Sequence, residues 1–274
     1  MNIRRIAGAL GAEISGVDLH QPLTETQAAS LWAAYLEHKV VFLRNQPLTP
    51  AQFLGFARTF GTPQEYPFVK AIDGFPQIIE VKKLEHERVN FGGVWHSDTT
   101  YLDEPPMGTM LLSKEIPPHG GDTLFASQEA AYAALSDTMQ RLLHGLVGIS
   151  SSAKADVSRT REDRMHSDGK QPAPKDYVAR HPVVRTHPET GAKSLYVNVA
   201  HTVGIEGLTE AESAPLLRFL FEHQVKPEFT CRWSWEPGSI AFWDNRSVQH
   251  NPVNDYHGFR RVLQRITLAG SRPV

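Results

Sequence analysis

Short strand-like segments separated by turns constrain the fold of this chain more than any other feature. Residues 181–199, "HPVVRTHPETGAKSLYVNV", contain β-branched and apolar residues on either side of a proline- and glycine-containing turn. Residues 229–244, "FTCRWSWEPGSIAFWD", repeat this design with a bend at 236–238, and residues 259–270, "FRRVLQRITLAG", are typical of one final strand. Many short strands favour a sandwich or barrel over alternating β–α units.

Helix-capping patterns occur at only a few places in the chain. Thr24 followed by Gln27 forms a capping-box pattern, and Thr49-Pro50 supplies an N-cap followed by a favourable first helical residue. With similar signals at Ser136 and Thr209, the predicted helices cover residues 25–38, 50–61, 137–146 and 210–223. We therefore predict a mainly β (α+β) fold in which the helices are peripheral.

The chain contains no internal repeat, low-complexity block or linker that would divide it. Its 274 residues suffice for one large domain, so we predict a single domain over residues 1–274. Residues 151–176 are polar and poor in pattern, and they contain Gly169, Pro172 and Pro174. A long irregular stretch in a compact domain is often a lid, so an active-site lid is predicted there.

Charge and cysteine content exclude several classes of function. The formal net charge is -2, so no electrostatic attraction to nucleic acid or to acidic membranes is expected. No apolar run approaches the ~20 residues that span a bilayer, and the glycine-broken opening "MNIRRIAGALGA" makes a poor signal peptide. A cytoplasmic protein is expected. Because Cys231 is the only cysteine, metal ligands would have to be histidines and carboxylates.

A His-x-Asp triplet, His96-Ser97-Asp98, lies within "VWHSDTTYLD". The neighbouring tryptophan, threonines and tyrosine favour extended structure, in which residues two apart project from the same face and can bind one metal ion. A second copy, His166-Ser167-Asp168, falls in the charged 151–176 stretch, where no strand would hold it. We expect the first triplet to be functional and the second to be an exposed loop.

A third protein ligand must come from a distant part of the chain. The candidates are His187, His201, His223, His250 and His257. His250 is favoured because it follows a strand-like segment and precedes Asn251-Pro252, which ends that segment at a sheet margin. His223 closes a predicted helix and is expected to interact with its dipole, and His187 belongs to a turn.

Two arginines share one face of the final predicted strand. Arg261 and Arg265 are separated by about 13 Å along a strand. They could point outward from an edge strand, where charges hinder aggregation. Alternatively, they could line a cavity as two anion anchors, because arginine binds carboxylate or sulfonate oxygens in bidentate fashion.

Several segments together resemble the TauD/TfdA (taurine and 2,4-dichlorophenoxyacetate dioxygenase) family of iron(II)- and 2-oxoglutarate-dependent oxygenases. The segments are "WHSDTTYLDEPP", "GGDTLFAS", "HPVVRTHPETGAKSLYVN", "AFWDNRSVQH" and "RRVLQRITLAG". The resemblance spans nearly the whole chain. It implies a double-stranded β-helix, that is, a jelly-roll barrel with helices packed outside, and it suggests a homodimer or homotetramer.

The resemblance also implies roles for individual residues. His96, Asp98 and His250 would be the iron ligands, in agreement with the facial triad of non-heme Fe(II) oxygenases. Thr123 and Arg261 would hold the distal carboxylate of 2-oxoglutarate. Arg265 would anchor the acidic end of the substrate and lie close to the co-substrate as well.

The implied reaction is hydroxylation of a C–H bond by O2, with conversion of 2-oxoglutarate to succinate and CO2. Related halogenating enzymes lack the carboxylate that Asp98 supplies, so hydroxylation is the expected outcome. The protein would position one C–H bond of a small organic acid and exclude competing reactions.

The substrate pocket departs from the taurine enzymes. Tyr66 stands where those enzymes have a sulfonate-binding histidine, Val69 replaces a tyrosine, and Gly92 replaces an asparagine. The pattern is closer to members that oxidise aryloxyalkanoates, in which the main-chain N–H at the Thr99 position and the Arg265 position share the substrate carboxylate. Alkyl sulfonates and sulfate esters are also compatible, and taurine dioxygenase proper is kept as an alternative.

Two other classes of protein use similar residues. A zinc-dependent hydrolase could use the same three ligands, but the paired arginines would then have no purpose. In a non-catalytic jelly-roll binding module, the buried ligands would carry an unexplained desolvation cost.

Overall fold

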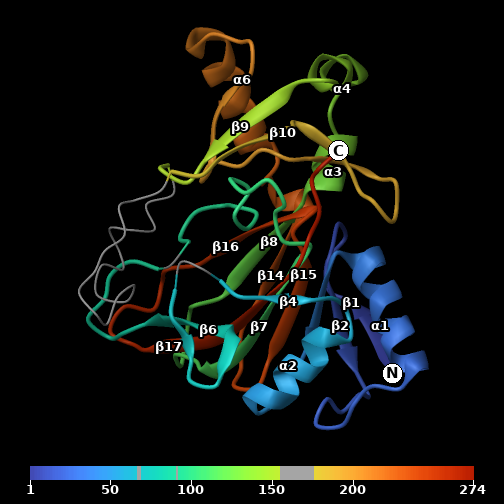
Figure 1. The fold of residues 1–274 in the computed structure, drawn as a ribbon, viewed down its shortest axis with the longest axis vertical. Helices are drawn as coiled ribbons and strands as arrows, with labels where there is room; N and C mark the ends of the chain where they lie inside the picture. The colour runs from blue at the N-terminus through green and yellow to red at the C-terminus, as the bar shows by residue number, and fades with distance from the viewer. Residues whose placement is uncertain (67–68, 91, 155–175) are drawn as a thin grey trace.

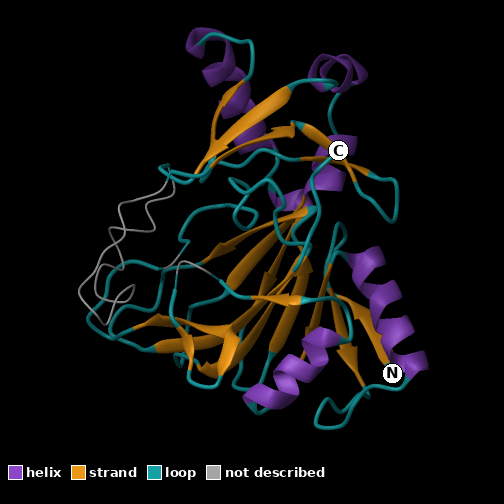
Figure 2. Ribbon diagram, in the orientation of Figure 1, coloured by secondary structure: helices purple, strands orange, loops and turns teal. Residues whose placement is uncertain are grey.

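Strands are the main elements of the computed structural model, which describes residues 1–66, 69–90, 92–154 and 176–274 (Figures 1 and 2). Among those residues, a nine-stranded sheet has the order β1-β2-β3-β15-β7-β17-β6-β5, and β4 pairs with β17. Its strands are β1 (Asn2–Arg5), β2 (Ala12–Ser15), β3 (Val40–Leu43), β4 (Pro63–Gln64), β5 (Ala71–Ile72), β6 (Phe75–Lys83), β7 (Gly108–Glu115), β15 (Ile240–Asp244) and β17 (Arg261–Leu268).

A second sheet packs against one face of this large sheet. It consists of β14 (Thr230–Trp233), β8 (Thr123–Ser127) and β16 (Val248–Pro252) in that order. Phe42 of β3 stacks on Trp233 of β14 with ring centroids 4.2 Å apart, and Phe125 of β8 lies 5.6 Å from Trp243 of β15. Aromatic and aliphatic side chains of both sheets thus form a shared core, beside which the candidate site lies.

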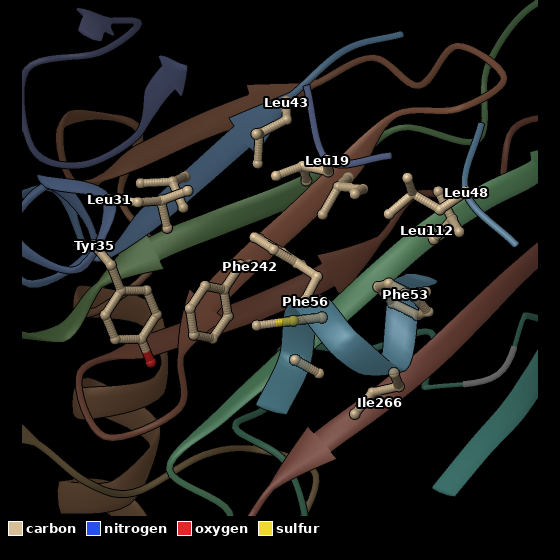
Figure 3. Close-up of a cluster of buried hydrophobic side chains, with 14 of the residues drawn as sticks. Leu19, Leu31, Tyr35, Leu43, Leu48, Phe53, Phe56, Leu112, Phe242 and Ile266 are labelled. Carbon is tan, nitrogen blue, oxygen red and sulfur yellow. The ribbon is translucent and has the colours of Figure 1, made fainter. Parts of the chain in front are cut away.

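Helices cover the opposite face of the large sheet. Helix α1 (Glu25–His38) begins at the Thr24 capping box and α2 (Pro50–Arg58) at the Thr49 capping box. Their apolar side chains pack on the sheet in the cluster that Figure 3 shows. Tyr35 of α1, for example, stacks on Phe242 of β15 with ring centroids 4.1 Å apart.

The remaining elements gather at one end of the molecule around a third apolar cluster (Figure 1). They are α3 (Gln128–Ala133), α4 (Asp137–Leu143), α6 (Glu210–His223), a 3-10 turn (Pro227–Phe229), β9 (Val147–Ser151), β10 (Val178–Pro182), β11 (Val184–Thr186), β12 (Lys193–Leu195) and β13 (Thr202–Ile205). Strands β10, β9 and β13 form one small sheet in that order, and β11 pairs with β12.

The predicted mainly β fold with peripheral helices is confirmed. All four predicted helices are present, although α2 and α4 each end three residues earlier than the pattern indicated. The predicted strands at 181–199 do pair, as β11 and β12. Those at 229–244 do not, because β14 joins β8 in the small sheet whereas β15 lies between β3 and β7 in the large one.

The position of β17 decides between the two interpretations of its arginines. It lies between β7 and β6 in the interior of the large sheet, so it is not an edge strand. The predicted lid at 151–176 lies largely outside the described residues, and the triplet at 166–168 lies wholly outside them. None of the described helices is long and apolar enough to cross a membrane.

Candidate active site

Three predicted metal ligands converge between the two sheets. His96 and His250, the latter on β16, form an isolated antiparallel bridge with N···O distances of 3.1 and 2.8 Å, which sets their imidazole centroids 4.1 Å apart. Asp98 completes the group. One ligand atom from each of the three buried side chains lies within 4.8 Å of the other two.

Asp98 reaches this position through a turn rather than a strand. The expectation of extended structure around the triplet is wrong, because beyond Ser97 the chain turns at residues 98–101. Thr99 has a φ of +43°, which is unusual for a β-branched residue. The turn nevertheless places Asp98 Oδ1 3.7 Å from His96 Nε2 and 3.9 Å from His250 Nε2. A strained residue held in a buried site is typical of functional centres.

The protonation states suit metal binding. His96 Nδ1 lies 2.7 Å from the Val94 carbonyl oxygen and donates to it as N–H, which leaves Nε2 with a free lone pair. Burial lowers the pKa of His96 and His250, so both imidazoles are neutral near pH 7. Burial alone would raise the pKa of Asp98. The positive charge of Arg265 is the largest of the opposing effects, which together hold this pKa well below its usual range.

Two neutral imidazoles and one carboxylate are the donor set of the facial triad that binds Fe(II) in non-heme oxygenases. These three residues therefore fit a divalent transition metal and leave room for further ligands on it.

A chain of hydrogen bonds fixes the orientation of the Asp98 carboxylate. Thr109 Oγ1 donates to Asp98 Oδ2 at 2.6 Å, and Asn245 Nδ2 donates to Thr109 Oγ1 at 2.8 Å. Trp243 Nε1 in turn donates to Asn245 Oδ1 at 2.9 Å. Oδ2 is thereby engaged, and Oδ1 faces the imidazoles. Sequence reasoning missed Thr109 and Asn245, although Asn245 belongs to the quoted segment "AFWDNRSVQH".

Replacement of Thr109 by valine tests this chain of hydrogen bonds. Valine keeps the shape of threonine but removes the donor to Asp98, so we expect metal affinity to fall by about 10- to 100-fold. Calorimetric titration with Mn(II) measures the effect. Thr230→Val, on β14, should leave the affinity unchanged; an equal affinity in the Thr109 variant would show that this hydrogen bond does not orient the ligand.

Both arginines of β17 are buried beside the triad. Arg265 Nη2 lies 3.0 Å from Asp98 Oδ1 as an ion pair, although the contact lacks the alignment of a hydrogen bond. Arg261 Nη2 donates to Thr123 Oγ1 at 3.4 Å. Within the described part of the chain, Arg261 Nε, Arg265 Nε and Arg265 Nη2 have no hydrogen-bond partner. Buried donors without acceptors are costly, so these guanidinium groups suit an anionic ligand.

One cavity adjoins the two imidazoles and both arginines. It is lined by His96, His250, Thr123, Trp243, Arg261 and Arg265, among other residues. Tyr66 lies beside it, with its ring centroid 5.0 Å from the Arg265 guanidinium carbon, and the buried Thr99 directly follows Asp98 in the sequence. The structure thus brings together the residues that the sequence singled out for the metal and the co-substrate, with Tyr66 beside Arg265.

The other candidate histidines are not part of this group, and His257 is exposed. His187 Nε2 lies 3.0 Å from Asp244 Oδ2, and His223 Nε2 lies 2.8 Å from the Ala131 carbonyl oxygen. The buried ring of His201 lies 6.1 Å from that of His96, a proximity that the sequence did not indicate.

Gly92 lies against the candidate ligand His96. Its φ is +67°, and a Cβ at this position would lie 2.8 Å from Cε1 of His96. A larger residue would therefore displace a candidate ligand.

Comparison with known proteins identifies the family. The model of the "Taurine catabolism dioxygenase TauD, TfdA family" matches residues 2–267. The chain belongs to this family. It is accordingly an alpha-ketoglutarate (2-oxoglutarate)-dependent dioxygenase, which leaves the zinc hydrolase and the non-catalytic binding module without support.

Two similar relatives have names that refer to alkyl sulfates or sulfate esters. The chain is 37% identical to an alkylsulfatase of Acinetobacter baylyi, over 98% of this chain and 85% of the relative. It is 35% identical to an alpha-ketoglutarate-dependent sulfate ester dioxygenase of Pseudomonas putida, over 100% of this chain and 91% of the relative.

Two solved structures have the same fold. A putative alpha-ketoglutarate-dependent taurine dioxygenase from Burkholderia xenovorans superposes with a TM-score of 0.87 at 37% identity, covering 100% of this chain and 94% of the other. AAD-2, solved in complex with Mn(II) and N-oxalylglycine, superposes with a TM-score of 0.80 at 28% identity, covering 99% and 98% of the two chains.

Proposed function

We propose that the protein uses Fe(II), 2-oxoglutarate and O2 to hydroxylate a C–H bond of a small organic acid anion, with His96, Asp98 and His250 as the iron ligands. The arrangement of the candidate site is the main support for this proposal. Three ligand atoms within 4.8 Å of one another adjoin a cavity that also contains two buried guanidinium groups with unpartnered N–H donors.

The bound iron, 2-oxoglutarate and O2 would supply the oxidising chemistry, converting 2-oxoglutarate to succinate and CO2. The protein's own residues bind and orient the reactants. Thr123 and Arg261 hold the distal carboxylate of 2-oxoglutarate, since they lie together on facing sheets at one side of the cavity. Arg265, beside Asp98, contacts the co-substrate near the metal and anchors the acidic group of the substrate.

We further propose an alkyl sulfate ester as the substrate. The names of two relatives at 37% and 35% identity support this class. Arg265, the Thr99 main-chain N–H and Tyr66 would hold the sulfate. Hydroxylation of the carbon that carries the ester oxygen gives a hemiacetal sulfate, which loses hydrogen sulfate and leaves an aldehyde.

An aryloxyalkanoate is the second candidate, favoured by an aromatic side chain beside Arg265. The Tyr66 ring centroid lies 5.0 Å from the Arg265 guanidinium carbon. Taurine fits less well, because Tyr66 replaces the expected sulfonate-binding histidine.

Anaerobic addition of Fe(II) and 2-oxoglutarate tests the reaction class, and a weak visible charge-transfer band is expected. A panel of alkyl sulfates, alkyl sulfonates, aryloxyalkanoates and taurine, scored by succinate release, then tests the substrate. We expect an alkyl sulfate to release succinate and sulfate in equal amounts. Absence of the band from Fe(II)-loaded protein would contradict the proposed function.

We also propose an architecture, a domain organisation and an assembly for the whole protein. The facing sheets would complete a double-stranded β-helix, residues 1–274 would form a single domain, and the protein would assemble as a homodimer or homotetramer. Light scattering of the purified protein measures the assembly, and a monomer would contradict the last expectation.

A further inference from the structure

Lys83 is a buried lysine that no part of the proposed reaction uses. It ends β6, and its Cα is the register partner of Arg261 in the antiparallel pairing of β6 with β17. Directly opposed residues of an antiparallel pair project from the same face of a sheet. Lys83 accordingly lines the same cavity as Arg261 and Thr123, although it is only 4% exposed.

The Lys83 ammonium has no hydrogen-bond partner in the part of the chain that the structure describes. It lies over the ring of Tyr256, 4.0 Å from the ring centroid, and the Tyr256 hydroxyl is held in place by donating to Asn90 Oδ1 at 2.7 Å. A ring face attracts a cation but does not satisfy its three N–H donors. Burial lowers the pKa of Lys83, although the negative charge of Glu87 acts to raise it. A lowered pKa is expected for an ammonium removed from water.

The surroundings of Lys83 identify the ligand class that would satisfy it. The Arg261 guanidinium carbon lies 5.9 Å from the centroid of the same Tyr256 ring, so both cations adjoin one aromatic side chain at one part of the cavity. Burial also lowers the pKa of Arg261. Two poorly solvated cations at the same part of a cavity require an anion there.

We propose that Lys83 is a second cation for the distal carboxylate of 2-oxoglutarate and donates to it beside Arg261 and Thr123. A carboxylate offers about four lone-pair sites, enough for one hydroxyl, one guanidinium and one ammonium. This inference rests on the proposed function and extends it. Lys83 is then a binding residue that favours 2-oxo acids with a distal carboxylate over 2-oxo acids with an apolar tail.

This role is tested by comparing the binding of two 2-oxo acids, one with a distal carboxylate and one without it. In Mn(II)-loaded protein without O2, calorimetry gives the Kd of 2-oxoglutarate and of 2-oxopentanoate, which has the same chain length but no distal carboxylate. Loss of a charge-assisted hydrogen bond predicts that Lys83→Met weakens 2-oxoglutarate binding by about 10- to 150-fold. The binding of 2-oxopentanoate should be unchanged.

Lys114→Met is the matched control, because Lys114, on β7, is exposed, does not line the cavity, and donates from Nζ to the Leu48 carbonyl oxygen at 3.2 Å. It should retain the wild-type Kd for 2-oxoglutarate. Lys83→Arg, which keeps a positive charge, should retain more affinity than Lys83→Gln, a second neutral variant that serves if the methionine variant does not fold.

An unchanged 2-oxoglutarate Kd in the neutral variants would overturn the proposal, as would equal weakening for both 2-oxo acids. Failure of the Mn(II)-loaded wild-type protein to bind 2-oxoglutarate is a different result, because it would overturn the proposed function itself.

Discussion

Alanine at His96 or Asp98 is expected to abolish iron-dependent succinate formation. Loss of a group that merely supports a ligand weakens a metal site by about 10- to 100-fold, so loss of a ligand should exceed that range. Two protein ligands would remain, too few to hold the metal in a defined geometry. Succinate release at saturating Fe(II), together with Mn(II) titration, measures the effect.

The two substitutions differ in their effect on stability. Asp98→Ala removes the ion-pair partner of the buried Arg265, and breaking a buried pair costs about 3–5 kcal/mol. His96→Ala removes a neutral side chain, so any loss of activity in that variant is easier to assign to the metal. Thermal unfolding of both variants separates the two effects.

His166→Ala is the matched control because it alters the same three-letter pattern elsewhere in the chain. It should leave succinate formation largely intact. If the His166 variant lost activity while the His96 variant kept it, the assignment of the metal site would be wrong.

Alanine at Arg265 should weaken substrate binding more than 2-oxoglutarate binding, and alanine at Arg261 should do the reverse. Removing one partner of a buried charge pair costs about 2–5 kcal/mol, which corresponds to roughly 30- to 5,000-fold in Kd. Arg261 adjoins Thr123 at the proposed distal carboxylate, whereas Arg265 adjoins Asp98 and Tyr66.

The measurement is the pair of dissociation constants, for 2-oxoglutarate and for the substrate that the panel identifies, in each Mn(II)-loaded variant. Mn(II) affinity of the Arg265 variant must be measured alongside, because Asp98 loses its ion-pair partner there. Similar losses for both ligands in both variants would contradict the division of roles between the arginines.

Local sequence patterns predicted the parts of the site that depend on local structure. Strand periodicity placed Arg261 and Arg265 on one face of β17, and both line the cavity. The His-x-Asp spacing predicted the proximity of His96 and Asp98 but not its cause, which is a turn containing Thr99 with a positive φ. Spacing limits how far apart two side chains can lie, and several backbone conformations satisfy that limit.

The remaining features depend on contacts between distant parts of the chain. The bend at 236–238 was predicted, but turn residues do not determine which strands pair, and β14 and β15 enter different sheets. Thr109 and Lys83 are ordinary strand residues in the sequence. Only pairing across the sheet brings Lys83 opposite Arg261, and only packing between sheets brings Thr109 to Asp98.

If Asp98 binds the metal as proposed, its contact with Arg265 would make the binding of metal and of co-substrate interdependent. Without metal, the carboxylate is the counter-ion of the guanidinium. Once a metal cation binds Asp98 Oδ1, the carboxylate no longer neutralises the charge of the Arg265 guanidinium. The guanidinium then attracts an incoming anion more strongly. Thermodynamic reciprocity then requires the anion to tighten metal binding by the same factor. The two ligands should therefore load cooperatively, so that iron is retained best when 2-oxoglutarate is abundant.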